Sequence, residues 1–250
     1  MKKKGETLSN QVTNFISFGN EPEQVAAFHK MLRELRQEDG VYGSLDFNKL
    51  IPMPEPMNIE SGTWTNQGLQ AYRSFMAGRK NAETFKKEHP DAWELGRQAY
   101  ENIQKYGYPT WFEWRIQHWG TRCNAYSCVE LRQGDQTMRF ETAWRRVLEI
   151  VRALSKKYPD QTVTYRWADA ELGADVGEAV FQNGKIADVH IPKPHSREAH
   201  QLARDIMKND LAHFDPDLSK GKKSRGYRAG TFEEHARRKR GREREFHFKS

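Results

Sequence analysis

The order of its strand-like and helix-like segments constrains the fold of this chain more than any other feature of the sequence. Alternating apolar residues predict strands at 11–18, 121–131, 136–144, 161–169 and in a closing hairpin at 178–191. Apolar residues at helical spacing predict helices at 20–40 and 145–160. The resulting order is strand, helix, strand, strand, helix, strand. This is the split βαβ, or ferredoxin-like, plan.

The strand patterns also predict two unlike faces on one antiparallel sheet. Met138, Phe140 and Trp144 alternate with polar residues along one strand, and the next strand places Val163, Tyr165 and Trp167 on one side. Helices are expected to cover this apolar face, which makes the fold class α+β. Asn183-Gly184 predicts the tight turn of the extra C-terminal hairpin. The polar face is expected to carry Tyr126, Glu130, Arg139, Glu141 and Arg166.

A helical insertion is expected at residues 58–119, between the first helix and the second strand. It holds 12 of the 29 aromatic residues, which predicts a small aromatic core of its own. Within WFEWRIQHW, helical spacing places Trp111, Phe112, Ile116 and Trp119 on one face, which we interpret as a packing seam. Trp114 is expected to point elsewhere and is a candidate protein-binding residue, together with Tyr126.

These elements predict four segments along the chain. Residues 1–10 are expected to be disordered, and residues 11–192 to form the ferredoxin-like domain with its insertion. Residues 193–218 are expected to form a C-terminal helix. Residues 219–250, which we call the basic arm, carry 12 Lys or Arg against 4 Glu, while the rest of the chain carries 29 against 30 Asp or Glu.

The sequence contains no motif for phosphate-loop, dinucleotide, zinc-protease or serine-hydrolase chemistry. His190, His195 and His200 lack the usual spacings of metal ligands. Cys123 and Cys128 are five apart on a predicted strand, so they are expected to face opposite ways as reduced thiols. We therefore expect no catalytic residues, no cofactor and no metal; an enzyme would instead show a deep pocket lined by His118, Glu130 or Arg139.

The basic arm indicates a polyanionic partner, because clustered positive charge binds phosphates without needing a particular sequence. A solubilising tail, or an arm lying on the rest of the chain, would have the same composition. The residues expected to contact nucleic acid or a ribonucleoprotein are Lys222, Lys223, Arg225, Arg228, Arg237, Arg238, Lys239, Arg240, Arg242 and Arg244. No apolar stretch is long enough for a membrane span, and no signal peptide is evident, so a cytoplasmic location is expected.

Short motifs in a fixed order resemble one family. They are DFNKLIPMP, W-x-x-x-x-WGT-R-x-NAY, F-x-TAW, ALSKKYPD and GEAVFQNG, spread over residues 12–192. Together they resemble the YubB-like family of phage- and plasmid-encoded proteins, which carry a ferredoxin-like domain of unassigned function. The resemblance implies a mobile-element origin and a bacterial host cytoplasm, and it implies no reaction.

Two functions of different classes follow as hypotheses. The first is a non-enzymatic accessory protein that binds nucleic acid or a ribonucleoprotein through the basic arm. The second is a protein-binding inhibitor of a host defence complex, of the anti-defence or anti-CRISPR type, that acts through the acidic body or the aromatic helices.

Overall fold

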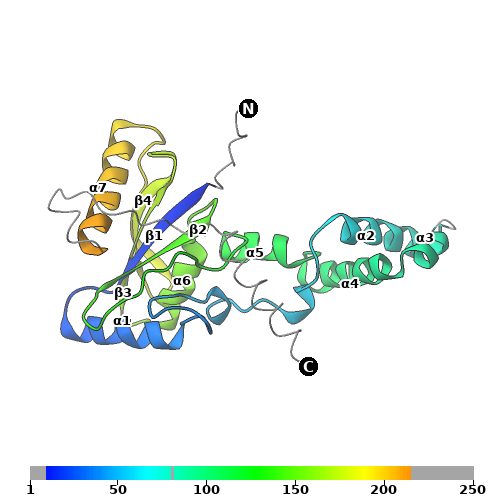
Figure 1. Ribbon diagram of the computed structural model, residues 1–250, viewed down its shortest axis with the longest axis horizontal. Helices are drawn as coiled ribbons and strands as arrows, with labels where there is room; N and C mark the ends of the chain where they lie inside the picture. Colours follow the sequence, from blue (N-terminus) through cyan, green and yellow to red (C-terminus); the bar gives the residue numbers. More distant parts are fainter. Residues whose placement is uncertain (1–9, 80–81, 215–250) are drawn as a thin grey trace, which may run out of the picture. The chain divides into compact units, whose positions relative to one another are not determined.

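The centre of the protein is an antiparallel sheet of five strands in the order β2-β1-β3-β4-β5 (Figure 1). This computed structural model describes residues 10–79 and 82–214, and the chain divides into two compact units, residues 1–203 and 204–250. The strands are β1 (Gln11–Ser17), β2 (Thr137–Ala143), β3 (Thr162–Asp169), β4 (Val176–Gln182) and β5 (Lys185–His190). The helices that belong with the sheet are α1 (Pro22–Glu34) and α6 (Leu148–Lys157).

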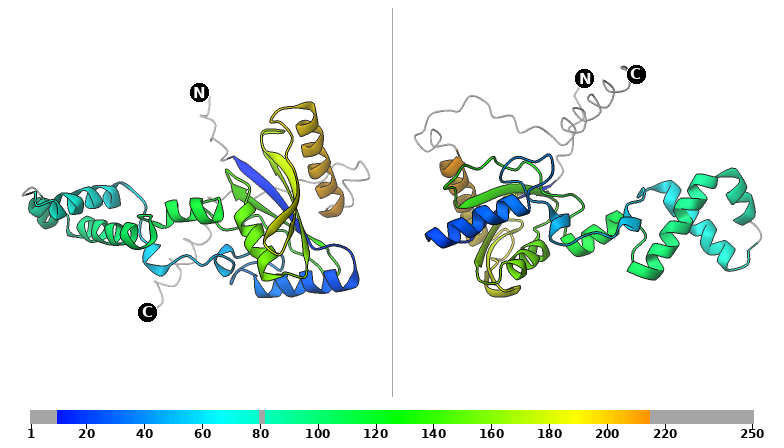
Figure 2. Two further views of the ribbon diagram at one scale, coloured as in Figure 1. Left: turned by 180° about the vertical axis from the view of Figure 1, so that it is seen from behind. Right: turned by 90° about the horizontal axis from the view of Figure 1, so that it is seen from below.

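The split βαβ plan is confirmed. β1 lies between β2 and β3 and pairs with both in antiparallel register, with Phe15 opposite Arg139 on one side and Arg166 on the other. α1 follows β1, and α6 joins β2, the first strand in the sheet order, to β3 in the middle of the sheet, as the order of elements predicts (Figure 2). The fold is α+β.

The predicted strand at 121–131 is wrong as a regular strand. It reaches β2 through an isolated bridge, in which Tyr126 and Glu141 exchange backbone hydrogen bonds of 3.1 and 2.7 Å, and through the N–H of Val129, which donates to the carbonyl of Arg139 at 3.2 Å. Ser127, directly after the bridge, has a φ of 48°. A left-handed residue breaks the alternation on which a strand depends. The segment therefore runs along β2 as an irregular edge, and Leu131 donates its N–H to the carbonyl of Tyr42.

The apolar face of the sheet forms the main core. Phe140, Tyr165 and Trp167 are fully buried as predicted, and α6 packs over the β3–β5 side of the sheet. Trp144, which was expected on the same face, is instead 55% exposed. β2 ends at Ala143 and Trp144 has a φ of 72°, so its side chain leaves the alternating pattern.

The closing hairpin is confirmed. β4 and β5 are joined by Asn183 and Gly184, both at positive φ (46° and 74°), as a two-residue turn of this handedness requires. β5 is exposed along its whole length.

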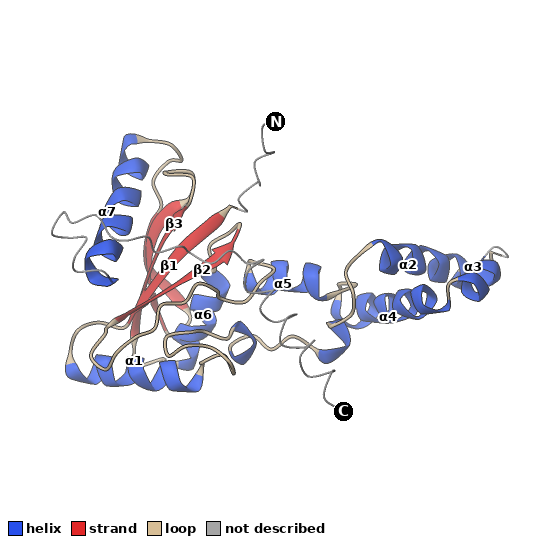
Figure 3. Cartoon of the chain, viewed as in Figure 1, coloured by secondary structure: helices blue, strands red, loops and turns tan. Residues whose placement is uncertain are grey.

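The insertion consists of α2 (Thr63–Met76), α3 (Ala82–Glu88), α4 (Pro90–Tyr106) and α5 (Trp111–Trp119), with short 3₁₀ turns at Phe47–Lys49 and Glu55–Met57 before it (Figure 3). Tyr72 of α2 meets Trp93 and Tyr100 of α4 at ring-centroid distances of 5.2 and 5.4 Å, which confirms the predicted aromatic cluster. α2 and α4 can approach this closely because Gly68 and Gly96 face each other: a Cβ added to Gly96 would lie 2.0 Å from the backbone of Gly68.

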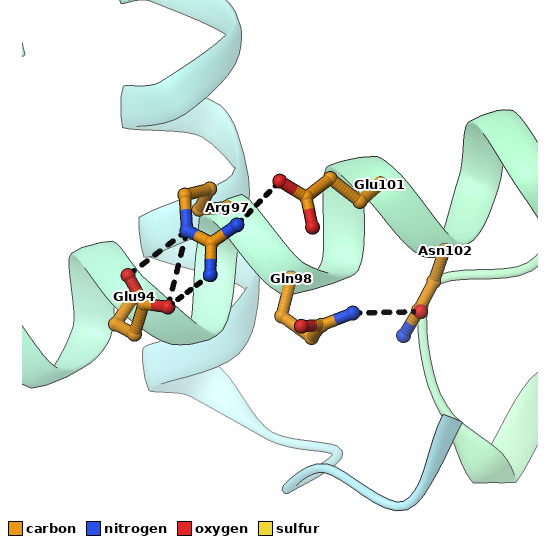
Figure 4. Close-up of polar contacts among 5 residues, drawn as sticks. All are labelled: Glu94, Arg97, Gln98, Glu101 and Asn102. Carbon is orange, nitrogen blue, oxygen red and sulfur yellow. Dashed lines mark hydrogen bonds and ion pairs between the residues drawn. The ribbon is translucent and has the colours of Figure 1, made fainter. Parts of the chain in front are cut away.

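α4 has one face on α2 and another that carries polar contacts (Figure 4). Arg97 forms ion pairs with Glu94 and Glu101 on the exposed side of the helix. Asn102, which is buried, accepts from Gln98 and donates to the carbonyls of Pro56 and Pro109 at 2.8 and 3.1 Å. Asn102 therefore fixes the end of α4 to the chain segments that precede α2 and α5.

α7 (Arg197–Phe214) accounts for the helix that was predicted within residues 193–218. The expectations for residues 1–9, for the end of that helix after residue 214 and for the basic arm lie outside the described residues. Among the residues that are described, no helix combines the length and the hydropathy needed to cross a bilayer.

Candidate functional site

The ten basic residues predicted to contact nucleic acid all lie between Lys222 and Arg244, outside the part of the chain that the structure describes. The described residues contain the second set of candidates: Trp114, Tyr126 and the charged groups of the polar sheet face.

The expectation that Trp114 points away from the packed face of its helix is wrong. Trp114 is only 5% exposed; it stacks on His118 at 4.3 Å and meets Trp119 edge-on at 6.1 Å. Burial lowers the pKa of His118, so this ring is neutral at pH 7. Trp119 is buried as predicted and donates its Nε1–H to the carbonyl of Ile51 at 2.9 Å. Trp114 is therefore part of the seam between α5 and its surroundings.

Tyr126 lies half-buried at the isolated bridge beside Glu141. Burial, and then the nearby carboxylate of Glu141, raise the pKa of its phenol. The phenol is therefore protonated at physiological pH, and Tyr126 provides a neutral hydrogen-bonding group at the edge of the polar face.

The charged groups on the polar face are joined in ion pairs. Arg139 contacts Glu141 within β2 at 3.1 Å, and Arg166 of β3 contacts Glu178 of β4 at 2.9 Å. Phe15, whose register position lies between Arg139 and Arg166, is 7% exposed. Glu130 is exposed on the irregular edge segment. This arrangement is that of same-strand and cross-strand ion pairs, which are ordinary on the polar face of a sheet.

The histidines near the end of the sheet contact single acidic residues. His190 lies 3.4 Å from Glu198, and His195 lies 3.9 Å from Glu171. Within the described residues, no group of three or more His, Cys, Asp or Glu side chains is placed to hold a metal ion. Cys123 and Cys128 are both free thiols.

Two features of the surface were missed by the sequence analysis. Trp64, Phe75 and Met76 of α2 are 49%, 41% and 56% exposed. Arg115 lies between two tryptophans of α5, and the sequence signal that could have found it is the spacing Trp111-x-x-x-Arg115-x-x-x-Trp119.

Sheet order, register and helix placement together define an α+β protein with a ferredoxin-like sheet and a helical insertion. Residues 122–210 match the family model described as the ferredoxin-like domain in Api92-like protein. The match covers β2 to β5 and begins after β1 and α1, so β1, which lies between β2 and β3 in the sheet, comes from the chain before the matched region.

One solved structure is similar in part. It is the crystal structure of protein api92 from Yersinia pseudotuberculosis, which is 10% identical, with 76% of this chain and 100% of that chain covered and a TM-score of 0.35. A TM-score this low supports no inference about the site. No curated protein matches the chain.

Proposed function

We propose that this chain is a non-enzymatic accessory protein of a phage or plasmid that binds nucleic acid or a ribonucleoprotein through its basic arm, in the cytoplasm of a bacterial host. The observation that carries the proposal is the charge asymmetry: 12 basic and 4 acidic residues in positions 219–250, against 29 and 30 elsewhere. The resemblance of residues 12–192 to the YubB-like family supports the mobile-element origin.

The described charges support the assignment of binding to the arm. Arg139, Arg166 and Arg146 each contact a carboxylate, at Glu141, Glu178 and Asp175 respectively. A cation already paired within the fold gains less from a phosphate, because the existing pair must first be broken. The lysines and arginines of the arm outnumber its acids three to one, so the arm keeps a net positive charge even if each of its acids pairs with one of them.

The direct test compares the full chain with a variant that ends at residue 218, in binding to labelled duplex DNA, single-stranded DNA and RNA. Loss of binding with an unchanged far-UV spectrum and melting temperature supports the proposal. A matched pair refines it: one variant changes Arg237, Arg238 and Arg240 to Gln, and the other changes Glu233, Glu234 and Glu243 to Gln. The first should weaken binding and the second should strengthen it; binding that survives the truncation would refute the proposal.

A second function is favoured by the three exposed apolar side chains of α2. A helix that exposes Trp64, Phe75 and Met76 has the composition of a protein-docking surface, since aromatic residues and Met are enriched at interfaces. This chain would then inhibit a host defence complex through its helical insertion. The test is recovery of a stoichiometric protein partner from nuclease-treated host lysate. The partner should be lost with Trp64→Ser and Met76→Ser together and kept with Trp144→Ser, which changes an exposed tryptophan elsewhere.

A further inference from the structure

Arg115 occupies an unusual position on α5. Trp111 lies one helical turn before it and Trp119 one turn after it, and its guanidinium carbon is 5.1 and 4.7 Å from the centres of the two rings. Contacts of this kind stabilise the cation through the electron-rich faces of the rings. Trp119 is 1% exposed, so the guanidinium lies at the border between the core and the surface.

The polar atoms of Arg115 are incompletely satisfied. Its Nε is buried and has no hydrogen-bond partner, and among the described residues no carboxylate lies within ion-pair distance of its guanidinium. Buried polar atoms in native proteins almost always have a partner, so each exception calls for an explanation. Burial lowers the pKa of Arg115, while nearby Cys123 and Asp46 favour its charged form.

Asp46, the acid that favours the charged form of Arg115, makes hydrogen bonds to other groups. The Oδ1 of Asp46 accepts from the backbone N–H of Asn48 and from the Nδ2 of Asn124, both at 2.9 Å. Asp46 therefore balances part of the positive charge without pairing with it. Because Nε is enclosed, the two terminal nitrogens are the groups left to meet a ligand, and they form a planar fork that matches a carboxylate.

We infer that Arg115, flanked by Trp111 and Trp119, is a binding site for a carboxylate group from outside this chain. The flanking rings suit a planar anion that enters in the plane of the guanidinium. The charge of Asp46 disfavours a phosphate, which brings up to two negative charges to the same place. Carboxylate binding at Arg115 does not require the nucleic-acid binding proposed above.

The test is a titration of the full chain, followed by the NMR signals of the indole Nε1–H groups of Trp111 and Trp119. Sodium acetate and sodium phosphate are compared at equal ionic strength, with sodium chloride as the reference. Acetate should shift both signals saturably, and phosphate should bind more weakly. Arg115→Met keeps the stem that packs on the rings and should weaken acetate binding by about tenfold or more, the value of a charge-assisted pair. Arg132→Met, which changes an exposed arginine, should leave binding unchanged.

A second arm separates the two sources of such a group. An end-capped tetraglutamate peptide that saturates the same signals at a lower concentration than acetate identifies an acidic polypeptide as the partner; equal concentrations identify a free organic acid. End-capped tetraglutamine is the neutral control. The inference is overturned if neither acetate nor the peptide moves the two signals, if phosphate binds as well as acetate, or if a folded Arg115→Met protein binds acetate as well as the unchanged protein.

Discussion

Asn14, Thr142 and Tyr165 meet on the buried face of the sheet, one from each of the three strands β1, β2 and β3. The hydroxyl of Tyr165 donates to the Oδ1 of Asn14 at 2.6 Å and accepts the N–H of Val147, at the start of α6, at 3.0 Å. The Nδ2 of Asn14 donates to the Oγ1 of Thr142 at 2.9 Å. A chain of bonds in a low-dielectric core fixes the register of the strands and the position of the helix.

Tyr165→Phe should lower the free energy of unfolding by about 1–3 kcal/mol, because it leaves the Oδ1 of Asn14 and the N–H of Val147 buried without their partner. Urea denaturation of the two proteins measures this difference. Tyr126→Phe is the matched control, since among the described residues the hydroxyl of Tyr126 has no hydrogen-bond partner; it should change stability much less. If the two substitutions lowered the free energy of unfolding equally, the hydrogen bonds of Tyr165 would not be the cause of the loss.

The two free thiols should differ in their response to alkylation. Burial raises the pKa of Cys128 to about 11, with a partly opposing hydrogen bond from the backbone of Leu45. Only a thiolate reacts, so at pH 8 the folded Cys123→Ser protein should react with iodoacetamide about a hundredfold more slowly than the same protein in urea. The rate should rise as the pH is raised towards 11. A Cys128 that reacts equally fast in both states would contradict this account.

At the scale of elements, α2 and α4 depend on the contact between Gly68 and Gly96. Gly96→Ala would place a methyl group against the backbone of α2 and force the helices apart, at a cost of about 1–3 kcal/mol in stability. Near-UV circular dichroism should also weaken, because Tyr72 and Trp93 would separate. Gln70→Ala, at an exposed position of α2, is the control and should leave both measurements nearly unchanged. A Gly96→Ala protein with unchanged stability and an unchanged near-UV spectrum would mean that α2 and α4 are not in contact at Gly68 and Gly96.

The elements that alternation or turn chemistry specifies could be predicted from the sequence. β2, β3 and the β4–β5 hairpin are confirmed because a buried face imposes a period of two and Asn-Gly imposes a turn. The wrong predictions occur where the φ angle of a single residue determines whether a strand continues. Ser127 and Trp144 adopt positive φ angles, which the pattern of apolar and polar side chains does not predict. The predicted strand at 121–131 and the predicted orientation of Trp144 were therefore wrong.

The error at Trp114 has a different cause. α5 has nine residues and three tryptophans, so almost any helical face of it is apolar enough to be buried. The choice between faces depends on tertiary neighbours, here the stacking of Trp114 on His118 and the T-shaped contact with Trp119. The spacing of Trp111, Arg115 and Trp119 is visible in the sequence, but the buried Nε of Arg115 without a hydrogen-bond partner is a property of the packed structure.

At the scale of the whole molecule, charge is distributed unequally along the chain. Residues 219–250 carry a net charge of +8 (12 basic minus 4 acidic), and the other residues carry −1 (29 minus 30). Charge that is concentrated in one segment binds a polyanion by releasing counterions, whereas charge that is balanced by neighbouring acids does not. Nucleic-acid binding should therefore belong to the arm and depend steeply on salt.

The most direct measurement is the affinity of the full chain for duplex DNA over a series of salt concentrations. If six to eight cations of the arm meet phosphates, the logarithm of the association constant should fall against the logarithm of salt concentration with a slope of about −5 to −7. The variant that ends at residue 218 should show no such binding. A slope near zero, or the same slope with and without the arm, would contradict the central claim.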